Sequence, residues 1–365
     1  MASIRLVNIA KRYGSKTALD NIAFEVRDKE FFVIAGPPGA GATTTLRIIA
    51  GLERPDAGEV YIGDQLVNDV EPKDRDVSMV FENLALYPNK NGYDNIAFPL
   101  RQRKVPVEEI RSRVIEVARM LKIENLLDRY PRTYSGGELQ RVAVARAIVR
   151  RPKVYLLDQP LANLDALIRA NMRAELKRLV REIGQTIIYT THDQIEAVSM
   201  GDRIAVINAG RIRQLDTSDG VYGRPKNKFV ASFIGSPRMN FIGCTYEVKD
   251  ERAMLISDSF SLDVTSLKDP IGRNAKDSEL ILGIRPEDIR TELTQKSFEA
   301  FQATVYVAEP MGSRTLISAQ LGKEKDVIRT MVPGATTVKP GDKVWLEFDR
   351  NKIHIFDKKT EEAIV

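Results

Sequence analysis

The stretch that most constrains this chain is residues 36–43, which read Gly-Pro-Pro-Gly-Ala-Gly-Ala-Thr. It follows the apolar run 31–35 and precedes a run that can form a helix, 44–50. A buried strand, a glycine-rich loop and a helix in this order are typical of a phosphate-binding loop. The glycines let backbone N–H groups turn inward, and the helix N-terminus adds positive potential.

The loop matches the expected pattern G-x-x-x-x-G-K-[ST] only in part. Gly36, Gly41 and Thr43 fit, but Ala42 stands at the lysine position, so the loop lacks its cation. Taken alone, the stretch fits a tight turn as well as a phosphate site, and the rest of the chain has to decide. The candidate phosphate-binding residues are Gly36, Pro37, Pro38, Gly39, Ala40, Gly41, Ala42, Thr43 and Thr44.

Length, composition and charge limit the classes of protein to which this chain can belong. A chain of 365 residues predicts two domains, and 43% hydrophobic with 29% charged residues is typical of a soluble globular protein. A net charge of +5 over this length is too mild to indicate nucleic-acid binding, and the single cysteine excludes an internal disulfide. The N-terminus does not resemble a signal peptide, and no run approaches the ~20 apolar residues that span a bilayer. We therefore expect any membrane association to run through another protein.

Strand and helix patterns alternate up to about residue 235. Strands are predicted at 3–8, 19–26, 31–35, 76–81, 154–158 and 186–191, hairpins near 59–66 and 204–215, helices at 43–50, 107–130, 139–149, 166–183 and 229–234, and irregular chain at 83–95. This order favours an α/β fold. From about 236, strands at 280–284, 303–307 and 315–319 and a hairpin at 343–348/352–356 predict a small β-barrel.

Polar side chains follow three of the predicted strands. Asp158 and His192 come at the ends of buried strands, and Glu82 follows the strand 76–81. Ligands of open α/β sheets gather at the carboxyl ends of strands. Asp158 is placed to hold a Mg²⁺ ion on nucleotide phosphates, and His192 to contact the γ-phosphate. Glu82 could reach an ion or a water, or could be a solvated loop carboxylate.

Two further features fit a nucleotide. Ser135, Gly136, Gly137 and Glu138 open a predicted helix, which makes a second anion-binding arrangement or an ordinary serine N-cap. Tyr13 lies 23 positions before the loop, where it could stack on an adenine or simply pack on the surface.

In their order and spacing these motifs resemble the ATP-binding subunit of an ABC transporter, of the class that imports carbohydrates and related polyols. The resemblance covers essentially the whole chain. It implies a Walker A loop at 36–43, a signature at 134–138, a Walker B strand ending at Asp158, a D-loop at 163–165 and an H-loop at His192. The importing class is suggested by 85–88, 93–98, 233–237 and 282–287.

The resemblance also implies domains, ligands and partners. It implies an ABC nucleotide-binding domain over 1–235, with a helical subdomain at about 86–152, and a regulatory oligonucleotide-binding-like barrel over 236–365. ATP and Mg²⁺ are the implied ligands, with Thr43, Asp158 and Glu82 at the metal and Tyr13, Asp165 and the signature at the nucleotide. The implied partners are a second ATPase subunit, two membrane permeases gripped through 83–98, and, indirectly, an external solute-binding protein. Nucleic acid is not among them, and the implied location is the cytoplasmic face of the membrane.

Three positions depart from the family pattern. Ala42 replaces the Walker lysine, Glu82 the Q-loop glutamine, and Gln159 the carboxylate after Asp158. Loss of the lysine removes charge-assisted hydrogen bonds worth roughly 1.5–3 kcal/mol each, and loss of a general base costs about 10²–10⁴ in rate. We expect little or no ATP hydrolysis at this site. The intact signature would then complete the site of an intact paralogue in a heterodimer.

Other readings stay open at this point. The substitutions could be engineered into a homodimeric ATPase, although Ala42 weakens ATP binding and so opposes a nucleotide trap. The chain could be a regulatory subunit that binds nucleotide without hydrolysing it. A soluble ABC ATPase without transport is disfavoured by residues 83–98, and nucleic-acid binding by the scattered aromatics of the C-terminal strands.

Overall fold

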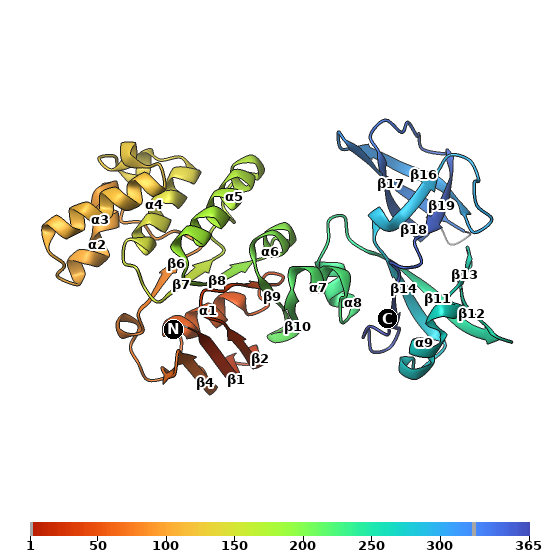
Figure 1. Cartoon of the computed structure of the whole chain (residues 1–365), viewed down its shortest axis with the longest axis horizontal. Coiled ribbons are helices and arrows are strands. Elements are labelled where there is room, and N and C mark those ends of the chain that lie inside the picture. The colour runs from red at the N-terminus through yellow and green to blue at the C-terminus, as the bar shows by residue number, and fades with distance from the viewer. Residues whose placement is uncertain (1–2, 323–325) are drawn as a thin grey trace. The chain divides into compact units, whose positions relative to one another are not determined.

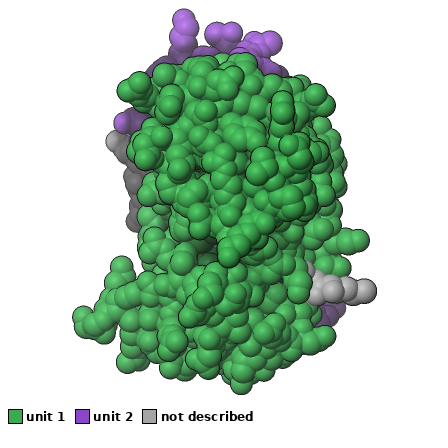
Figure 2. Space-filling model, turned by 90° about the vertical axis from the view of Figure 1, so that its left-hand side faces the viewer, with its two compact units in different colours: residues 1–220 green, residues 221–365 purple. Residues whose placement is uncertain are grey.

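The computed structural model describes residues 3–322 and 326–365. The chain forms two compact units, residues 1–220 and 221–365, which Figure 2 colours green and purple. The domain boundary predicted at residue 235 separates two family domains, whereas the boundary at residue 220 separates two compact units. The predicted boundary therefore stays a prediction.

The first unit is built on a six-stranded, mostly parallel sheet (Figure 1). Its order is β10-β9-β3-β8-β7-β6, with bounds Arg211–Thr217, Arg203–Asn208, Phe31–Ala35, Thr186–Thr191, Val154–Asp158 and Val77–Val80. Only the β10–β9 pair is antiparallel. β3, β7 and β8 are buried at every residue, as expected for central strands covered on both faces. Their carboxyl ends meet at one edge, which positions the site described below.

A second sheet and further helices complete this unit. The sheet has the order β2-β1-β4-β5 (Lys16–Val26, Ile4–Tyr13, Ala57–Ile62, Gln65–Leu66). Both sheets share one apolar core with α1 (Ala42–Ala50). The remaining helices of this unit are α2 (Gly92–Gln102), α3 (Val107–Met120), α4 (Gly136–Ile148), α5 (Ala166–Ile183) and α6 (Gln194–Met200). α7 (Ser218–Gly223) crosses the unit boundary, and α8 (Lys228–Phe233) belongs to the second unit. The α/β prediction is confirmed.

Two boundaries in this unit differ from the sequence predictions. The helix predicted over 107–130 ends at Met120, because Lys122 takes a left-handed backbone (φ 53°) and the chain then continues as a short 3₁₀ turn. The irregular stretch predicted over 83–95 ends earlier than expected. α2 begins at Gly92, where the Asn91 side chain accepts a hydrogen bond from the Asp94 N–H. No helix is predicted from the sequence over 92–102, which contains Pro99.

The second unit holds two five-stranded sheets around one core. One has the order β13-β12-β11-β14-β20 (Ser261–Asp263, Arg252–Ile256, Asn240–Lys249, Glu279–Ile284, His354–Asp357). The other has the order β15-β19-β16-β17-β18 (Ile289–Glu292, Lys343–Phe348, Phe301–Pro310, Arg314–Leu321, Asp326–Pro333), and a short helix α9 spans Lys268–Asn274. The predicted all-β second domain is confirmed. The predicted hairpin 343–348/352–356 is wrong: β19 pairs with β15 and β16, whereas β20 crosses over to pair with β14.

One buried side chain links the two sheets of the second unit. Asn240, at the start of β11, donates from Nδ2 to the Arg329 carbonyl (2.8 Å) and accepts at Oδ1 from the Arg329 N–H (2.8 Å). Nδ2 also donates to the Ile284 carbonyl at 3.2 Å. The amide group therefore pairs with β18 as a neighbouring strand residue would, and joins it to β11 and β14.

We expect His354, in β20, to make the stability of the second unit depend on pH. Burial lowers the pKa of its imidazole from 6.5 to about 4, with Arg285 and Lys352 adding to the effect. The folded state therefore keeps His354 neutral while the unfolded state takes up a proton below about pH 6.5. We expect the free energy of unfolding to fall between pH 6.5 and 4, by about 2 kcal/mol at pH 5 relative to pH 7.5.

Denaturant unfolding at the two pH values tests this expectation. The single tryptophan, Trp345, lies in β19 and its fluorescence reports on the second unit. His354→Gln should remove most of the difference between pH 7.5 and pH 5. An equal pH dependence in both proteins would show that another group carries it.

Candidate nucleotide site

The loop before α1 has a shape that only glycine allows at two positions. A Cβ at Gly36 would lie 2.2 Å from the Ile207 carbonyl oxygen. Gly41 has φ 112°, and a Cβ there would lie 2.7 Å from the Ala18 carbonyl oxygen. β9 and β2 therefore hold the loop close against the sheets, as a loop that exposes its backbone to a ligand requires.

The start of α1 offers free N–H donors. The first-turn amides of a helix have no acceptor within the helix, and no side chain caps this end, where Gly41 is the N-cap. In the described part of the chain, no hydrogen bond takes the amides of residues 42–44 to another element. An uncapped N-terminus beside a glycine-rich loop is a fitting cradle for phosphate oxygens.

Asp158 is the centre of a buried hydrogen-bond group. Its Oδ1 accepts from the Thr43 hydroxyl at 2.9 Å and from the Thr190 hydroxyl at 2.8 Å. Asp158 is 3% exposed and Thr190 is fully buried. The predicted pair of Thr43 and Asp158 is thus brought together at the loop, while no described residue donates to Oδ2.

Gln159 is fixed by its backbone at the same edge. It has φ 45°, a left-handed conformation that costs energy in a residue with a Cβ. Its N–H donates to both oxygens of Thr190, at 3.1 Å to the hydroxyl and 3.2 Å to the carbonyl. Its carbonyl accepts from the Ala162 N–H. The amide side chain at this position can orient a water molecule but cannot accept its proton.

His192 is tied to the first residue of the loop. Its Nδ1 lies 2.7 Å from the Gly36 carbonyl oxygen, and because a carbonyl only accepts, Nδ1 carries the proton. This leaves Nε2 as the ring atom for a ligand. The turn after His192 is held by Thr191 and Asp193, and Thr191 donates to the buried carboxylate of Glu196 at 2.6 Å.

The two other substituted positions contribute no cation and no built metal site. Ala42 is 5% exposed, and its methyl group packs in the apolar core. Glu82 is exposed, and its carbonyl accepts from Asn163 Nδ2 at 3.1 Å. Within residues 3–322 and 326–365, no group of three or more His, Cys, Asp or Glu side chains could hold a metal. Asp158, Glu82 and His192 therefore do not form such a group.

The donor set fits Mg²⁺ bound together with phosphates. Mg²⁺ is usually held by one or two carboxylates, a hydroxyl and the nucleotide itself, and not by a protein cage. Thr43 and Asp158 supply this minimal set. Glu82 as a third ligand stays a prediction.

The second anion-binding arrangement lies at the start of α4. Ser135 is its N-cap: Oγ accepts from the Glu138 N–H, and the Glu138 carboxylate accepts from the Ser135 N–H at 2.8 Å. That hydrogen bond is the main cause that lowers the pKa of Glu138, and Arg129 lies 3.4 Å from the same carboxylate. Ser135 and Gly136 are exposed, and no backbone hydrogen bond among the described residues joins them to the loop at 36–43.

Tyr13 and Asp165 are not brought to the loop by described contacts. Tyr13 is 44% exposed at the end of β1, with the Lys11 ammonium 5.4 Å from its ring centroid. Asp165 caps α5 by accepting from the Ile168 N–H at 3.0 Å. Their roles at the nucleotide stay predictions.

Several residues of the site were missed from the sequence. Thr190 holds Asp158, Asn163 holds the Glu82 carbonyl, and Arg169 donates to the Leu164 carbonyl while lying 3.5 Å from Asp193. The only signal for Thr190 was a polar residue late in an apolar strand. Glu82, the partner of Asn163, and Asp193, beside Arg169, lie too far along the chain for a local pattern to show them.

The glycine-rich loop, with its Thr43 hydrogen-bonded to Asp158 and its Gly36 hydrogen-bonded to His192, defines a nucleotide-binding protein of the P-loop class. The ABC transporter family profile matches residues 19–162, a MalK OB fold domain profile matches 235–289 and a TOBE domain profile matches 282–356.

Relatives match along the full length of the chain. The chain is 47% identical to the trehalose/maltose import ATP-binding protein MalK of Thermococcus litoralis and 45% identical to the oligosaccharides import ATP-binding protein MsmX of Bacillus subtilis, with 100% of both chains covered in each case. It is 40% identical to an sn-glycerol-3-phosphate import ATP-binding protein UgpC of Agrobacterium fabrum, with 98% of both covered.

A solved structure of an ATP-binding cassette supports the same assignment. The dimeric post-hydrolysis state of the cassette MJ0796 bound to ADP and Pi matches with a TM-score of 0.54 and 32% identity. The match covers 59% of this chain and 98% of that one. The chain belongs to the family of ATP-binding subunits of ABC import transporters, whose ligands are ATP and Mg²⁺ and which work as dimers with membrane permeases. In the described residues, no helix has the length and apolar character needed to cross a membrane.

Proposed function

We propose that this chain energises the import of a sugar or polyol, that its own Walker site hydrolyses ATP poorly, and that its signature completes the site of a second, intact ATPase subunit. The substrate class is supported by its relatives, which are named for importing trehalose and maltose, oligosaccharides and sn-glycerol-3-phosphate. The permease and an external binding protein would choose the solute.

The observation that carries the hydrolysis part is that, among the described residues, no lysine or arginine side chain hydrogen-bonds to the loop in which Ala42 stands. In the described chain, the side-chain hydrogen bonds of residues 36–45 involve Asp158, His192 and Gly41, and none comes from a lysine or an arginine. Within this chain, the β/γ-phosphate charge would then be met by backbone amides, His192 and Mg²⁺, without a side-chain cation from the loop. Gln159 leaves the attacking water without a base.

The retained parts of the site support nucleotide binding without turnover. The glycine loop, the uncapped start of α1 and the Thr43–Asp158 pair are the parts that hold phosphate and metal. Bound nucleotide could thus still draw two subunits together. Nucleotide binding would depend more strongly on the metal here than in a site with the lysine. Ala42, Glu82 and Gln159 together carry one negative charge, whereas the lysine, glutamine and carboxylate of the family pattern have a net charge of zero.

The signature end supports a role in a partner's site. Ser135 and Gly136 are exposed at the start of a 13-residue helix whose capping box fixes their backbone. The Ser135 hydroxyl accepts from the Glu138 N–H and so keeps its own proton for a ligand. Amides and a hydroxyl at a helix N-terminus suit the γ-phosphate of a nucleotide on another subunit.

The remaining partners follow from the same reading. Residues 83–98 would receive the permeases, and Ala85 and Tyr87 in this stretch are exposed. The chain would lie at the cytoplasmic face of the membrane through these contacts. The unit 221–365 would stabilise the dimer or receive a regulator.

Native mass spectrometry of the complex that the chain assembles into tests the proposal. We expect two different ATPase subunits beside two permeases. A complex that contains only copies of this chain would exclude the heterodimer. ATP turnover by the purified chain alone, at a rate similar to that of its relatives, would contradict the hydrolysis part.

A further inference from the structure

The segment between β6 and α2 contains two adjacent residues in a costly backbone conformation. Leu84 has φ 58° and Ala85 has φ 45°, both left-handed and both in residues with a Cβ. The turn is tight: the Leu84 N–H donates to the Phe81 carbonyl at 2.8 Å, and the Ala85 N–H donates to the Asn83 carbonyl at 2.6 Å. Such a pair persists only where surrounding groups hold it.

The group that holds both residues is the Arg146 guanidinium, from the last turn of α4. Nη1 donates to the Ala85 carbonyl and Nη2 to the Leu84 carbonyl, each at 2.7 Å. The guanidinium carbon also lies 5.5 Å from the ring centroid of Tyr87. A planar fork with two parallel donors fits two successive carbonyls in a way that a lysine ammonium does not.

Other partners hold the ends of the segment but not its turn. Asn163 donates to the Glu82 carbonyl at 3.1 Å. Asn95 is fully buried and both accepts from the Tyr87 N–H (2.8 Å) and donates to the Tyr87 carbonyl (3.1 Å). Among the described residues, Arg146 is thus the side chain that fixes the two left-handed residues themselves.

We propose that Arg146 is a positioning residue that fastens the Leu84–Ala85 turn to α4, so that the stretch 83–98 moves together with the helix that Ser135 begins. The transport part of this inference rests on the proposed function, in which 83–98 contacts the permeases. The fastening itself does not depend on it.

The fastening is tested in the purified full-length chain by a double-mutant cycle. Arg146→Ala should lower the melting temperature by about 5 °C or more, because two charge-assisted hydrogen bonds are lost. Ala85→Gly should stabilise the turn, because glycine adopts positive φ without a Cβ penalty. The gain from Ala85→Gly should be larger in the Arg146→Ala background, and amide exchange at 84–87 should rise about tenfold or more in Arg146→Ala.

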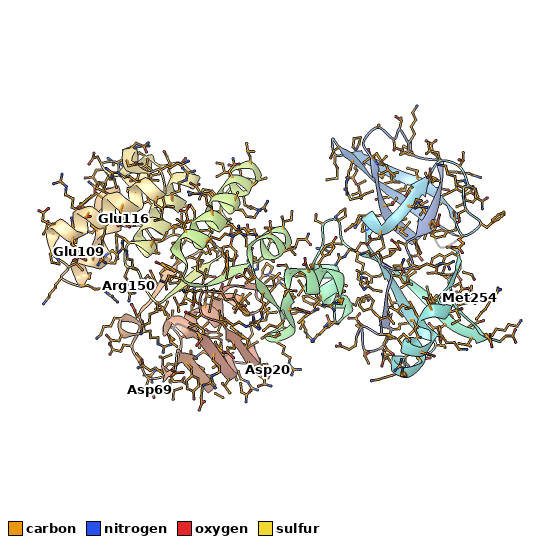
Figure 3. The ribbon with its side chains drawn as sticks, in the orientation of Figure 1. Asp20, Asp69, Glu109, Glu116, Arg150 and Met254 are labelled. Carbon is orange, nitrogen blue, oxygen red and sulfur yellow. The ribbon has the colours of Figure 1, made fainter. Side chains whose placement is uncertain are left out.

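A matched control comes from a neighbouring arginine. Arg151 pairs with Glu116 on α3, labelled in Figure 3, at 2.8 and 2.9 Å, and both side chains are half exposed. Arg151→Ala makes the same change of charge but should move the melting temperature by no more than about 2 °C. If Arg146→Ala does not fold, Arg146→Lys keeps the charge without the fork and should still show the faster exchange. Unchanged exchange at 84–87 together with additive melting shifts would overturn the proposal.

The positioning role is tested in the assembled transporter. With Arg146→Ala in this chain, we expect solute transported per ATP hydrolysed to fall several-fold while ATP turnover stays within about threefold. An unchanged ratio would overturn the positioning role even if the thermal cycle shows coupling. Absence of transport with the wild-type chain would instead contradict the proposed function. In that case, the melting temperatures and the amide exchange still test whether Arg146 fastens the Leu84–Ala85 turn.

Discussion

If the Walker site of this chain hydrolyses ATP poorly, as we propose, restoring two residues should make it active. In the double variant Ala42→Lys/Gln159→Glu, we expect ATP turnover by the purified chain to rise at least about 10²-fold. The glutamate would supply the missing base next to Asp158, where the left-handed backbone of residue 159 fixes its direction. The lysine would add charge-assisted hydrogen bonds to the phosphates, which strengthens binding by roughly 1.5–3 kcal/mol for each bond.

The single variants separate the two effects. Ala42→Lys should tighten ATP binding, measured by calorimetry with Mg²⁺ present, with little gain in turnover. Gln159→Glu should raise turnover only at high ATP. Gln65→Glu makes the same chemical change at an exposed residue and should alter neither quantity. A wild-type chain that already matches the double variant would mean that the site uses a base and a cation that these positions do not supply.

In the proposed heterodimer, a change in the signature of this chain should lower ATP turnover far more than a change at its own catalytic position. With Gly136→Asp in this chain, we expect ATP turnover of the proposed heterodimer to fall by about 10²–10³, because the added carboxylate would repel a γ-phosphate at the helix N-terminus that holds it in the proposal. With Gln159→Ala in this chain, turnover should stay within about twofold. Together the two measurements show whether this chain contributes to hydrolysis through its signature or through its own Walker site.

Two controls keep this comparison meaningful. Gly272→Asp introduces the same side chain in α9, where a Cβ meets nothing within 4 Å, and should leave turnover unchanged. Gly136→Asp should also keep the melting temperature within a few degrees, because a Cβ there meets only the Leu164 side chain, at 3.2 Å. Equal losses from Gly136→Asp and Gln159→Ala would place the chemistry in this chain's own site.

The parts of the fold that could be predicted are those fixed by local patterns. Apolar runs such as Phe31–Ala35 and Val154–Leu157 predicted buried central strands, and the glycine spacing of 36–43 with its flanking strand and helix predicted a candidate phosphate-binding loop. The positions of Asp158 and His192 at strand ends followed from the same reading. Those predictions rest on the rule that parallel strands end at one edge of the sheet.

The parts that could not be predicted depend on contacts between distant segments. Thr190 meets Asp158 across 32 positions of sequence, and Arg146 meets Ala85 across 61. The wrong hairpin in the second unit has the same origin. A short polar stretch between two apolar runs is typical of a turn, yet the preference of β20 for β14 is set by the shared core and not by the connecting residues.

Asn240 couples the unfolding of the two sheets of the second unit. Because its amide pairs with both the N–H and the carbonyl of Arg329, peeling β18 away would break two hydrogen bonds and leave Oδ1 of the buried Asn240 without a partner, while Nδ2 would keep only the Ile284 carbonyl. Such orphaned groups are expensive, so partial opening is disfavoured relative to complete unfolding. Residues 221–365 should therefore melt in a single cooperative step, and protease sites in β17 and β18 should open together with those in β11.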